Sequence, residues 1–205
     1  ELAESEGANS KNLFQILNTA EKGNDETVRF LFGTAGTVLE MDEGHQFAKG
    51  HPGMHVFPAL LAAARNSEIS GEGFLRAFII GYDVGARIGL ASNLNPNMHP
   101  HGTWGGLGAA ASLAALHNMD TQQANEYLNI VSSLTLATSR KTMLEGATVR
   151  NSYTGVSNKM AHVALSLLKA GFTGESDGIK SIFDGVVSSR FDSKSAFELI
   201  GKRFE

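Results

Sequence analysis

The residues from Glu40 to Pro58 read EMDEGHQFAKGHPGMHVFP and join two segments with helical periodicity. The segment before them, Thr27–Met41, repeats apolar residues at helical spacing. The segment after them reads PALLAAAR, which predicts a helix with proline at its first position. Three glycines and a second proline inside the stretch predict a tight connection. The stretch is also rich in polar groups: His45, His51, His55, Glu40, Asp42 and Glu43. We expect a functional loop held between rigid helices; the simpler alternative is a solvated polar loop.

The composition bounds the class of protein. A chain of 205 residues, 42% hydrophobic and 19% charged, can bury one sizeable core. The net charge of -4, the pI near 6.0 and the lack of a basic run argue against a nucleic acid partner. Without cysteine there is neither a disulfide nor a thiolate metal site. No apolar run is long enough to span a membrane and no signal peptide opens the chain, so we expect a cytoplasmic protein without a membrane partner.

Helical patterns continue along the whole chain, and no segment alternates apolar and polar residues as a strand would. The fold class predicted is therefore all-α. Glycine at positions 33 and 36 costs helix stability, which predicts a neighbouring helix or a ligand in close approach. The charges of Arg76, Asp83 and Arg87 in a long apolar helix predict structural pairing more than catalysis. We expect helices over residues 12–18, 27–41, 58–65, 74–92, 107–118, 121–138 after a capping box, 156–170 before a Schellman stop, 178–183 and 196–200.

Two further polar connections resemble the first. Residues 93–106 read NLNPNMHPHGTWGG and contain His99 and His101; residues 139–155 read SRKTMLEGATVRNSYTG and contain Lys141, Arg150 and Tyr153. Gly102 and Thr103 precede a helix whose N-terminal N–H groups favour an anion such as a carboxylate. Each connection borders a helix rich in small residues, so we expect the three loops to converge on one cleft.

The side chains of the three loops suit proton abstraction next to a carboxylate, followed by elimination or reprotonation. Imidazole exchanges protons near neutral pH, carboxylates orient it, and cations bind an anionic substrate. A metal site of histidine and aspartate is an alternative, but we expect no HExxH motif or His-x-x-x-His pair on one helix face, so we predict no bound metal. Nucleophilic hydrolysis is weaker, because the chain has no GxSxG motif.

Four blocks of the sequence together resemble the MmgE/PrpD family, whose members include 2-methylcitrate dehydratase, cis-aconitate decarboxylase and iminodisuccinate epimerase. The blocks read EMDEGHQFAKGHPGMHVFPALLAAA, SGEGFLRAFIIGYDVGARIG, MHPHGTWGGLGAAASLAALHNMD and KAGFTG, within a similarity that covers residues 27–185. The resemblance implies a large all-helical domain with a smaller α+β lid, commonly in a homodimer. It also implies action on small di- or tricarboxylates without a metal or organic cofactor.

The resemblance places the active site between the helical domain and the lid. It assigns catalysis to His51, His99 and an acid of the 40–43 block, for which we take Asp42 while Glu40 and Glu43 stay open. Arg150 falls where the family has a lysine, and Tyr153 falls where it has a histidine. Because a guanidinium stays charged, we expect Arg150 to bind a carboxylate and not to carry a proton. The substrate-binding set expected is Arg150, His101, Lys141, Tyr153, Glu40 and His45.

These departures favour a divergent epimerase, isomerase or lyase over a typical methylcitrate dehydratase or cis-aconitate decarboxylase. A catalytically silent member that binds a small acid or serves dimerisation is the alternative. We expect residues 1–205 to form a single all-helical domain. The family pattern implies further helices before residue 1 and a lid after residue 205, so this piece alone is expected to be inactive.

Overall fold

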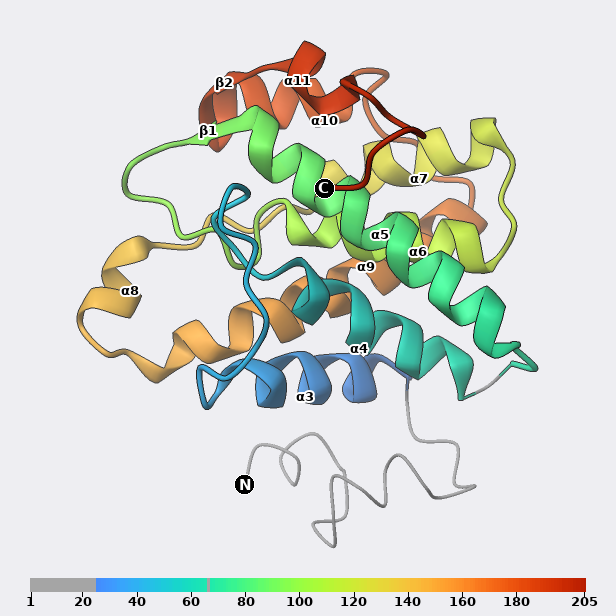
Figure 1. Ribbon diagram of the computed structural model, residues 1–205, viewed down its shortest axis with the longest axis horizontal. Helices are drawn as coiled ribbons and strands as arrows, with labels where there is room; N and C mark the ends of the chain where they lie inside the picture. Colours follow the sequence, from blue (N-terminus) through green and yellow to red (C-terminus); the bar gives the residue numbers. More distant parts are fainter. Residues whose placement is uncertain (1–24, 66) are drawn as a thin grey trace, which may run out of the picture.

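Helices make up the framework of the computed structural model, which describes residues 25–65 and 67–205 (Figure 1). The all-α class is confirmed; the helix expected over residues 12–18 lies outside the described residues. None of the described helices is long and apolar enough to cross a membrane. The helices are α3 (Asp25–Thr37), α4 (Pro52–Ala64), α5 (Gly71–Ala91), α6 (Gly105–Leu116), α7 (Thr121–Ser133), α8 (Arg140–Leu144), α9 (Tyr153–Lys169), α10 (Gly178–Ser181) and α11 (Ser193–Phe197), with a 3-10 turn η1 (Thr148–Ser152) and a π turn η2 (Ile182–Val186).

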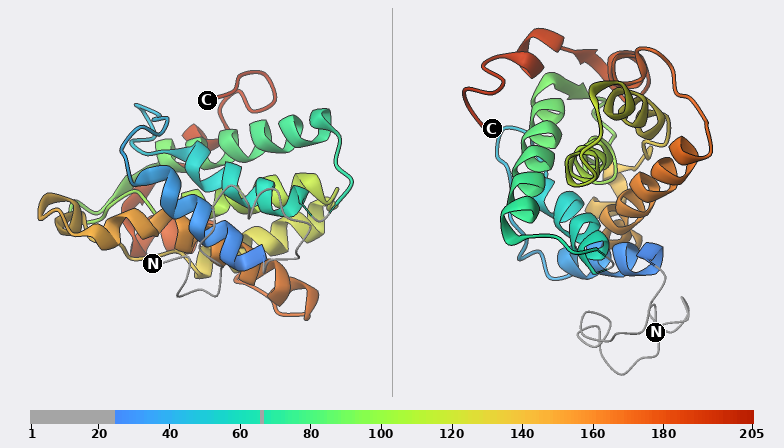
Figure 2. Two further views of the ribbon diagram at one scale, coloured as in Figure 1. Left: turned by 90° about the horizontal axis from the view of Figure 1, so that it is seen from below. Right: turned by 90° about the vertical axis from the view of Figure 1, so that its right-hand side faces the viewer.

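Helix α6 is the centre of the domain. The right-hand view of Figure 2 shows it end on, with α4, α5, α7 and α9 around it. Its residues from Gly105 to Ala114 are all buried, and most are glycine or alanine. A Cβ on Gly81 of α5 would lie 2.7 Å from the carbonyl oxygen of Gly108 in α6. The two helices therefore pack backbone against backbone, which only small residues permit.

A second glycine crossing joins α3 to α9. A Cβ on Gly33 would lie 2.7 Å from the Cα of Gly155, and a Cβ on Gly155 would lie 2.2 Å from the carbonyl oxygen of Phe30. The hydroxyl of Thr154 donates a 2.6 Å hydrogen bond to the Gly33 carbonyl across the same crossing. The expectation that these helix glycines serve close approach is confirmed, and the partner is a helix.

Helix α4 begins at Pro52, so the prediction of a start at Pro58 is wrong. His51 is the N-cap residue, Pro52 takes the first position, and Pro58 lies inside the helix. Proline has no N–H to donate to the carbonyl four residues earlier, which here belongs to Met54. The side-chain amide of Asn158 in α9 donates to that carbonyl instead, at 3.0 Å. A contact from another helix thus lets α4 continue through its proline.

Other helix boundaries differ from the expectation as well, and three examples follow. Helix α3 ends at Thr37 instead of residue 41, and Glu40 has a left-handed φ of 53°. Helix α5 starts at Gly71 instead of residue 74, because Ser70 caps it through a 3.0 Å bond from the Gly73 amide. Helix α7 ends at Ser133 instead of residue 138. The first connection consequently runs over residues 38–51, and the connection between α7 and α9 runs over residues 134–152.

Two local signals are confirmed. Asp120 and Gln123 form a reciprocal capping box at the start of α7. At the end of α9, Gly171 has φ +83°, and the amides of Gly171 and Phe172 bond to the carbonyls of Leu168 and Leu167, as a Schellman motif requires.

The chain after α10 forms a pairing that no pattern predicted. Strand β1 (Ser92–Leu94) pairs antiparallel with β2 (Ser188–Phe191), with Ser92 opposite Phe191 and Leu94 opposite Ser188. Strands this short carry too few residues for an alternating pattern to be visible. The pairing fixes the start of the 92–101 loop.

The prediction of structural pairing for all three charges of α5 is confirmed for Asp83 and Arg87. The Arg87 Nε donates to Asp83 Oδ2 at 2.7 Å, and the same guanidinium donates to the carbonyls of Ala196 and Glu198. Arg76 is instead exposed and bonds to Asn118. The buried pair therefore holds the segment around α11 against α5.

Candidate active site

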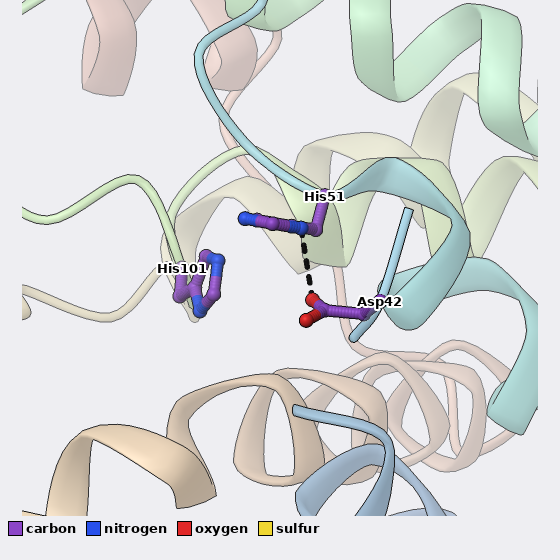
Figure 3. A group of neighbouring side chains, drawn as sticks. All are labelled: Asp42, His51 and His101. Atoms are coloured by element: carbon purple, nitrogen blue, oxygen red, sulfur yellow. Dashed lines mark ion pairs between the residues drawn. The ribbon is translucent and has the colours of Figure 1, made fainter. Parts of the chain in front are cut away.

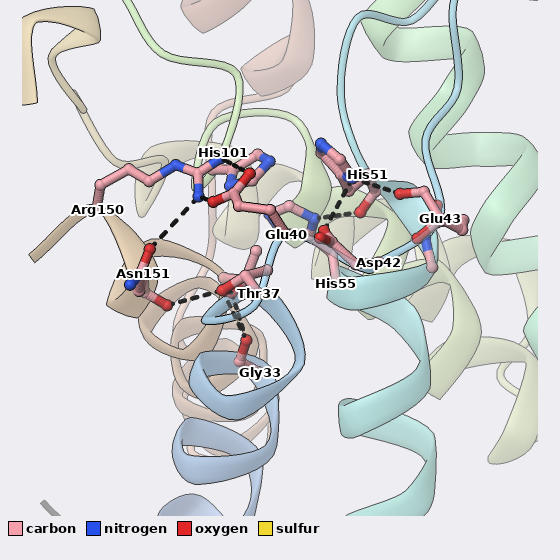
Figure 4. Close-up of polar contacts among 12 residues, drawn as sticks. Gly33, Thr37, Glu40, Asp42, Glu43, His51, His55, His101, Arg150 and Asn151 are labelled. Atoms are coloured by element: carbon pink, nitrogen blue, oxygen red, sulfur yellow. Dashed lines mark hydrogen bonds and ion pairs between the residues drawn. The ribbon is translucent and has the colours of Figure 1, made fainter. Parts of the chain in front are cut away.

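The three polar loops meet at one cavity of about 420 Å³, so the predicted convergence is confirmed. Its wall includes His51 from the first loop, His99 and His101 from the second, and Arg140 and Arg150 from the third. The volume falls within the range of about 300–1,000 Å³ that is usual for small-molecule sites. Figure 4 shows how the side chains of these loops face one another.

His51 and Asp42 form a dyad at the start of α4 (Figure 3). The His51 Nδ1 lies 2.8 Å from Asp42 Oδ2 and also contacts the main-chain carbonyl of Glu43. Both neighbours are hydrogen-bond acceptors, so Nδ1 carries the ring proton in the neutral imidazole. The Nε2 atom then holds a lone pair, and the ring lines the cavity. The Asp42 side chain is only 2% exposed, which fixes the orientation of the imidazole.

Glu43 supports this dyad from behind. Its Oε1 accepts a 2.7 Å hydrogen bond from the amide of Gly53 in the first turn of α4. Burial raises the pKa of Glu43, while the Gly53 amide and His51 act in the opposite direction. A Cβ at Gly53 would lie 2.7 Å from Glu43 Oε2, so a side chain here would displace the carboxylate. The Glu43 side chain therefore caps α4, and the Glu43 main-chain carbonyl contacts His51.

His99 and His101 stand in a fixed arrangement. The main-chain amide of His101 donates to His99 Nδ1 at 3.1 Å, so the neutral His99 ring carries its proton on Nε2. Thr138 holds both backbones, because its hydroxyl lies 2.9 Å and 2.7 Å from the carbonyl oxygens of His99 and His101. Burial, followed by the nearby His51 and Arg140, lowers the pKa of His99 to about 4.

His101 lies between the other two cavity histidines. Its ring centroid is 4.6 Å from that of His51 and 4.6 Å from that of His99, with the planes nearly perpendicular in each case. It is 2% exposed, and burial together with His55 and its other imidazole neighbours lowers its pKa to about 2. His101 is therefore neutral, and its ring lies between those of His51 and His99.

His55 belongs to the core and not to the cavity, which corrects its place among the loop histidines. It lies on α4 and is completely buried. Its Nδ1 donates to the His51 carbonyl at 2.9 Å, and its Nε2 accepts from the Gly102 amide at 3.2 Å. Burial lowers its pKa to about 4, so it stays neutral. The ring ties the backbone of His51 to the 99–102 loop.

Arg150 is buried beside the cavity and already has an acidic partner. Its Nη2 donates to Glu40 Oε2 at 2.9 Å, and its Nη1 pairs with Glu40 Oε1, so the contact is bidentate (Figure 4). The arginine is 8% exposed, whereas the Glu40 side chain is 58% exposed and faces an outer hollow. The structure thus places Arg150 at the cavity wall with its charge balanced.

Four residues expected to bind substrate do not line the cavity: Glu40, which faces the outer hollow, and the three that follow. Lys141 is exposed, pairs with Glu145 at 3.2 Å and borders a separate hollow. The His45 Nδ1 accepts from the Ala48 amide at 3.0 Å. The Tyr153 hydroxyl donates to Thr142, and its ring lies 6.1 Å from His99 without reaching the wall.

The prediction of an anion site at the start of α6 is wrong. The Gly102 amide donates to His55 Nε2, and the Thr103 amide donates to the Pro100 carbonyl at 3.1 Å. Both residues are buried, so their N–H groups are not available to a ligand. Two cations that do line the cavity were missed, Lys49 and Arg140. The adjacent basic pair at 140–141 was the signal for the second, but it did not show which of the two faces inward.

Asp42, His51 and His101 also have the residue types of a metal site, since one donor atom from each lies within 4.8 Å of the others. However, the His51 nitrogen nearest Asp42 faces two oxygen acceptors and needs its proton there. A metal on that nitrogen would have to displace the proton and approach the Glu43 carbonyl. The geometry favours an Nδ1 proton that is shared between the Glu43 carbonyl, its hydrogen-bond acceptor, and the Asp42 carboxylate at ion-pair distance. The absence of a metal stays a prediction.

Comparison with known proteins identifies the family to which the chain belongs. The model of the MmgE/PrpD N-terminal domain matches residues 3–195, so the chain belongs to the MmgE/PrpD family. Among curated proteins, the chain is similar to the cis-aconitate decarboxylase-like protein oryM of Aspergillus oryzae (strain ATCC 42149 / RIB 40), with 31% identity over 113 residues. That similarity covers 48% of this chain and 23% of the relative, so the chain spans a minor part of the relative's length.

Proposed function

We propose that this domain supplies the acid–base half of an active site that removes a proton next to a carboxylate of a small di- or tricarboxylate. One observation carries the proposal: the His51–Asp42 dyad opens onto a cavity whose described lining contains Lys49, Arg140 and Arg150 but no Asp or Glu. A base beside a cationic wall suits a substrate that is itself an anion and becomes more negative when it loses a proton.

His51 is the base in this mechanism. Its Nε2 lone pair accepts the proton from carbon, and the buried Asp42 carboxylate stabilises the resulting imidazolium through Nδ1. His99, with its proton on Nε2, donates a hydrogen bond to the developing negative charge, and the proton that His51 has taken from carbon is the one available to a leaving hydroxyl group. Departure of a leaving group gives a lyase, and return of a proton to the other face gives an epimerase.

The family membership supports a lyase or epimerase, and the relative's name contains a decarboxylase-like activity. Since the matched region is 23% of that relative, the complete reaction belongs to the full-length protein and not to residues 1–205 alone. The small carboxylate as ligand and a homodimer as the assembly are parts of the same proposal.

Solvent deuterium exchange followed by NMR tests the proposal. The full-length protein is incubated in D₂O with citrate, succinate, aspartate and cis-aconitate, and deuterium is sought at the carbon next to a carboxylate. Exchange without net product indicates an epimerase, whereas loss of water or CO₂ indicates a lyase. His51→Gln and Asp42→Asn should each slow exchange by about 10²–10⁴-fold.

His117→Gln is the matched control, because His117 caps the far end of α6 and lies outside the cavity lining. It should exchange at the wild-type rate. No exchange with any of these acids would refute the proposal and favour a catalytically silent member. Equal rates in wild type and His51→Gln would remove His51 from the role of base.

A further inference from the structure

The two cations expected to bind the substrate, Arg150 and Lys141, each already have an acidic partner. Arg150, which takes the place of the family lysine, is held bidentately by Glu40. Lys141 pairs with Glu145 outside the cavity. A substrate carboxylate would have to compete with Glu40 for Arg150.

Two other cations line the cavity without an acidic partner. Among the residues that the structure describes, neither Lys49 nor Arg140 takes part in an ion pair. Both side chains belong to exposed residues and both line the cavity. An unpaired cation at the wall of a cavity is a better partner for a carboxylate than one that is already neutralised.

The backbone under each of these cations is fixed. Lys49 has a left-handed φ of 58° and stands between Ala48, which is 3% exposed, and Gly50. A Cβ on Gly89 of α5 would lie 3.0 Å from that of Ala48, and a Cβ on Gly50 would lie 2.5 Å from the Trp104 ring. The backbone on either side of Lys49 thus packs against α5 and against Trp104.

Arg140 enters the cavity wall from another loop. It is the first residue of α8, and its amide donates to the Asn97 carbonyl at 2.8 Å. The neighbouring Met98 and Ser139 form an isolated bridge, which joins the loop carrying His99 to the start of α8. The position of Arg140 relative to His99 is therefore set by main-chain contacts, and only the long side chain has to be ordered by a ligand.

We propose that Lys49 and Arg140 bind the carboxylates of the substrate, while Arg150 stays paired with Glu40 as part of the cavity wall. This inference rests on the proposed function for the chemical class of the ligand. Two cations from different loops next to one base suit a ligand with at least two carboxylates, one to each cation. Specificity for polycarboxylates over monocarboxylates follows from the same arrangement.

Isothermal titration calorimetry of the full-length protein with citrate, succinate and acetate tests this. Arg140→Gln and Lys49→Gln should each weaken citrate binding by about 10- to 100-fold, which corresponds to the loss of one charge-assisted hydrogen bond. Arg140→Lys keeps the charge and should restore most of the affinity. Lys169→Gln, an exposed position at the end of α9, is the control and should change binding by less than about twofold.

Lys141→Gln and Arg150→Gln are the discriminating comparisons. Lys141→Gln removes the same charge one residue away from Arg140 and should behave like the control. If it weakens citrate binding as much as Arg140→Gln does, the effect is general electrostatics and the proposal is wrong. A large loss in Arg150→Gln with little change in Arg140→Gln would give the role to Arg150. Failure of wild type to bind citrate or succinate would also overturn it.

The binding measurement separates this inference from the proposed function. His51→Gln should still bind citrate with an affinity close to that of wild type, because imidazole is the base and not the anchor. Binding that depends on Lys49 and Arg140, together with no deuterium exchange, would leave the inference standing and refute the enzyme. Exchange at the wild-type rate in both Lys49→Gln and Arg140→Gln would support the enzyme and refute the assignment of these two cations.

Discussion

Replacing His55 by leucine should change both the stability of the domain and its dependence on pH. Leucine fills a similar space but cannot accept the hydrogen bond from the Gly102 amide. Leaving that buried amide without an acceptor costs about 1–3 kcal/mol at pH 8, where His55 is neutral in folded and unfolded chains alike. The loss of the bond to the His51 carbonyl adds to this cost.

The pH dependence has a defined sign. Burial lowers the pKa of His55 from 6.5 to about 4 in the folded protein, whereas in the unfolded chain it keeps the higher value. Below pH 6.5, His55 therefore binds a proton in the unfolded state but not in the folded state. The stability linked to neutral His55 is complete above pH 6.5 and is lost progressively as the pH falls to about 4. The full loss is about 3 kcal/mol, of which about 2 kcal/mol falls between pH 7 and pH 5.

Urea unfolding monitored by circular dichroism at pH 8, 7, 6 and 5 measures this difference. The gap in unfolding free energy between wild type and His55→Leu should narrow by about 2 kcal/mol from pH 7 to pH 5, because only wild type pays the protonation cost. Asn158→Leu is the control: it also removes a buried polar side chain, but one that does not titrate, so its gap should stay constant. A His55→Leu gap that is equally constant would refute the buried, neutral imidazole described above.

Three further substitutions test the packing, each by urea unfolding at pH 8. Gly155→Ala should destabilise by about 1–3 kcal/mol or more, since the added Cβ meets the Phe30 carbonyl at 2.2 Å; a change below about 0.5 kcal/mol would contradict the close crossing. Asn158→Leu should cost about 1–3 kcal/mol, because the Met54 carbonyl loses the donor that replaces the missing N–H of Pro58. Asp120→Ala should cost about 1 kcal/mol through loss of the capping box, and Asp120→Asn much less.

The helices could be predicted because their signals are local. The capping box at Asp120 and the glycine stop at Gly171 each depend on residues a few positions apart. The start of α4 could not be predicted in this way. Both Pro52 and Pro58 suit the first position of a helix, and the contact that allows the helix to run through Pro58 comes from Asn158, far along the chain.

The candidate site was predictable as a meeting of three loops but not in its charge balance. The pair of Glu40 with Arg150 joins residues 110 apart in the sequence, so no local pattern shows that this arginine is neutralised. The difference between Arg140 and Lys141 depends on which side of α8 faces the cavity. A helix of five residues is too short to show periodicity, so the sequence did not separate the two.

Acid sensitivity connects the stability of this domain to its proposed chemistry. His99 and His55 both have a pKa of about 4, so His99 stays neutral over the range in which the His55 contribution to stability declines. An activity that falls between pH 6.5 and pH 5 in step with the folded fraction therefore reports unfolding, to which the lowered pKa values of His55, His99 and His101 all contribute, and not protonation of His99 in the folded protein. An activity that falls while the protein remains folded reports a group at the cavity wall or on the substrate. Recording exchange and unfolding on the same samples at each pH separates the two, because unfolding changes both curves and a change at the wall of the folded protein changes only the first.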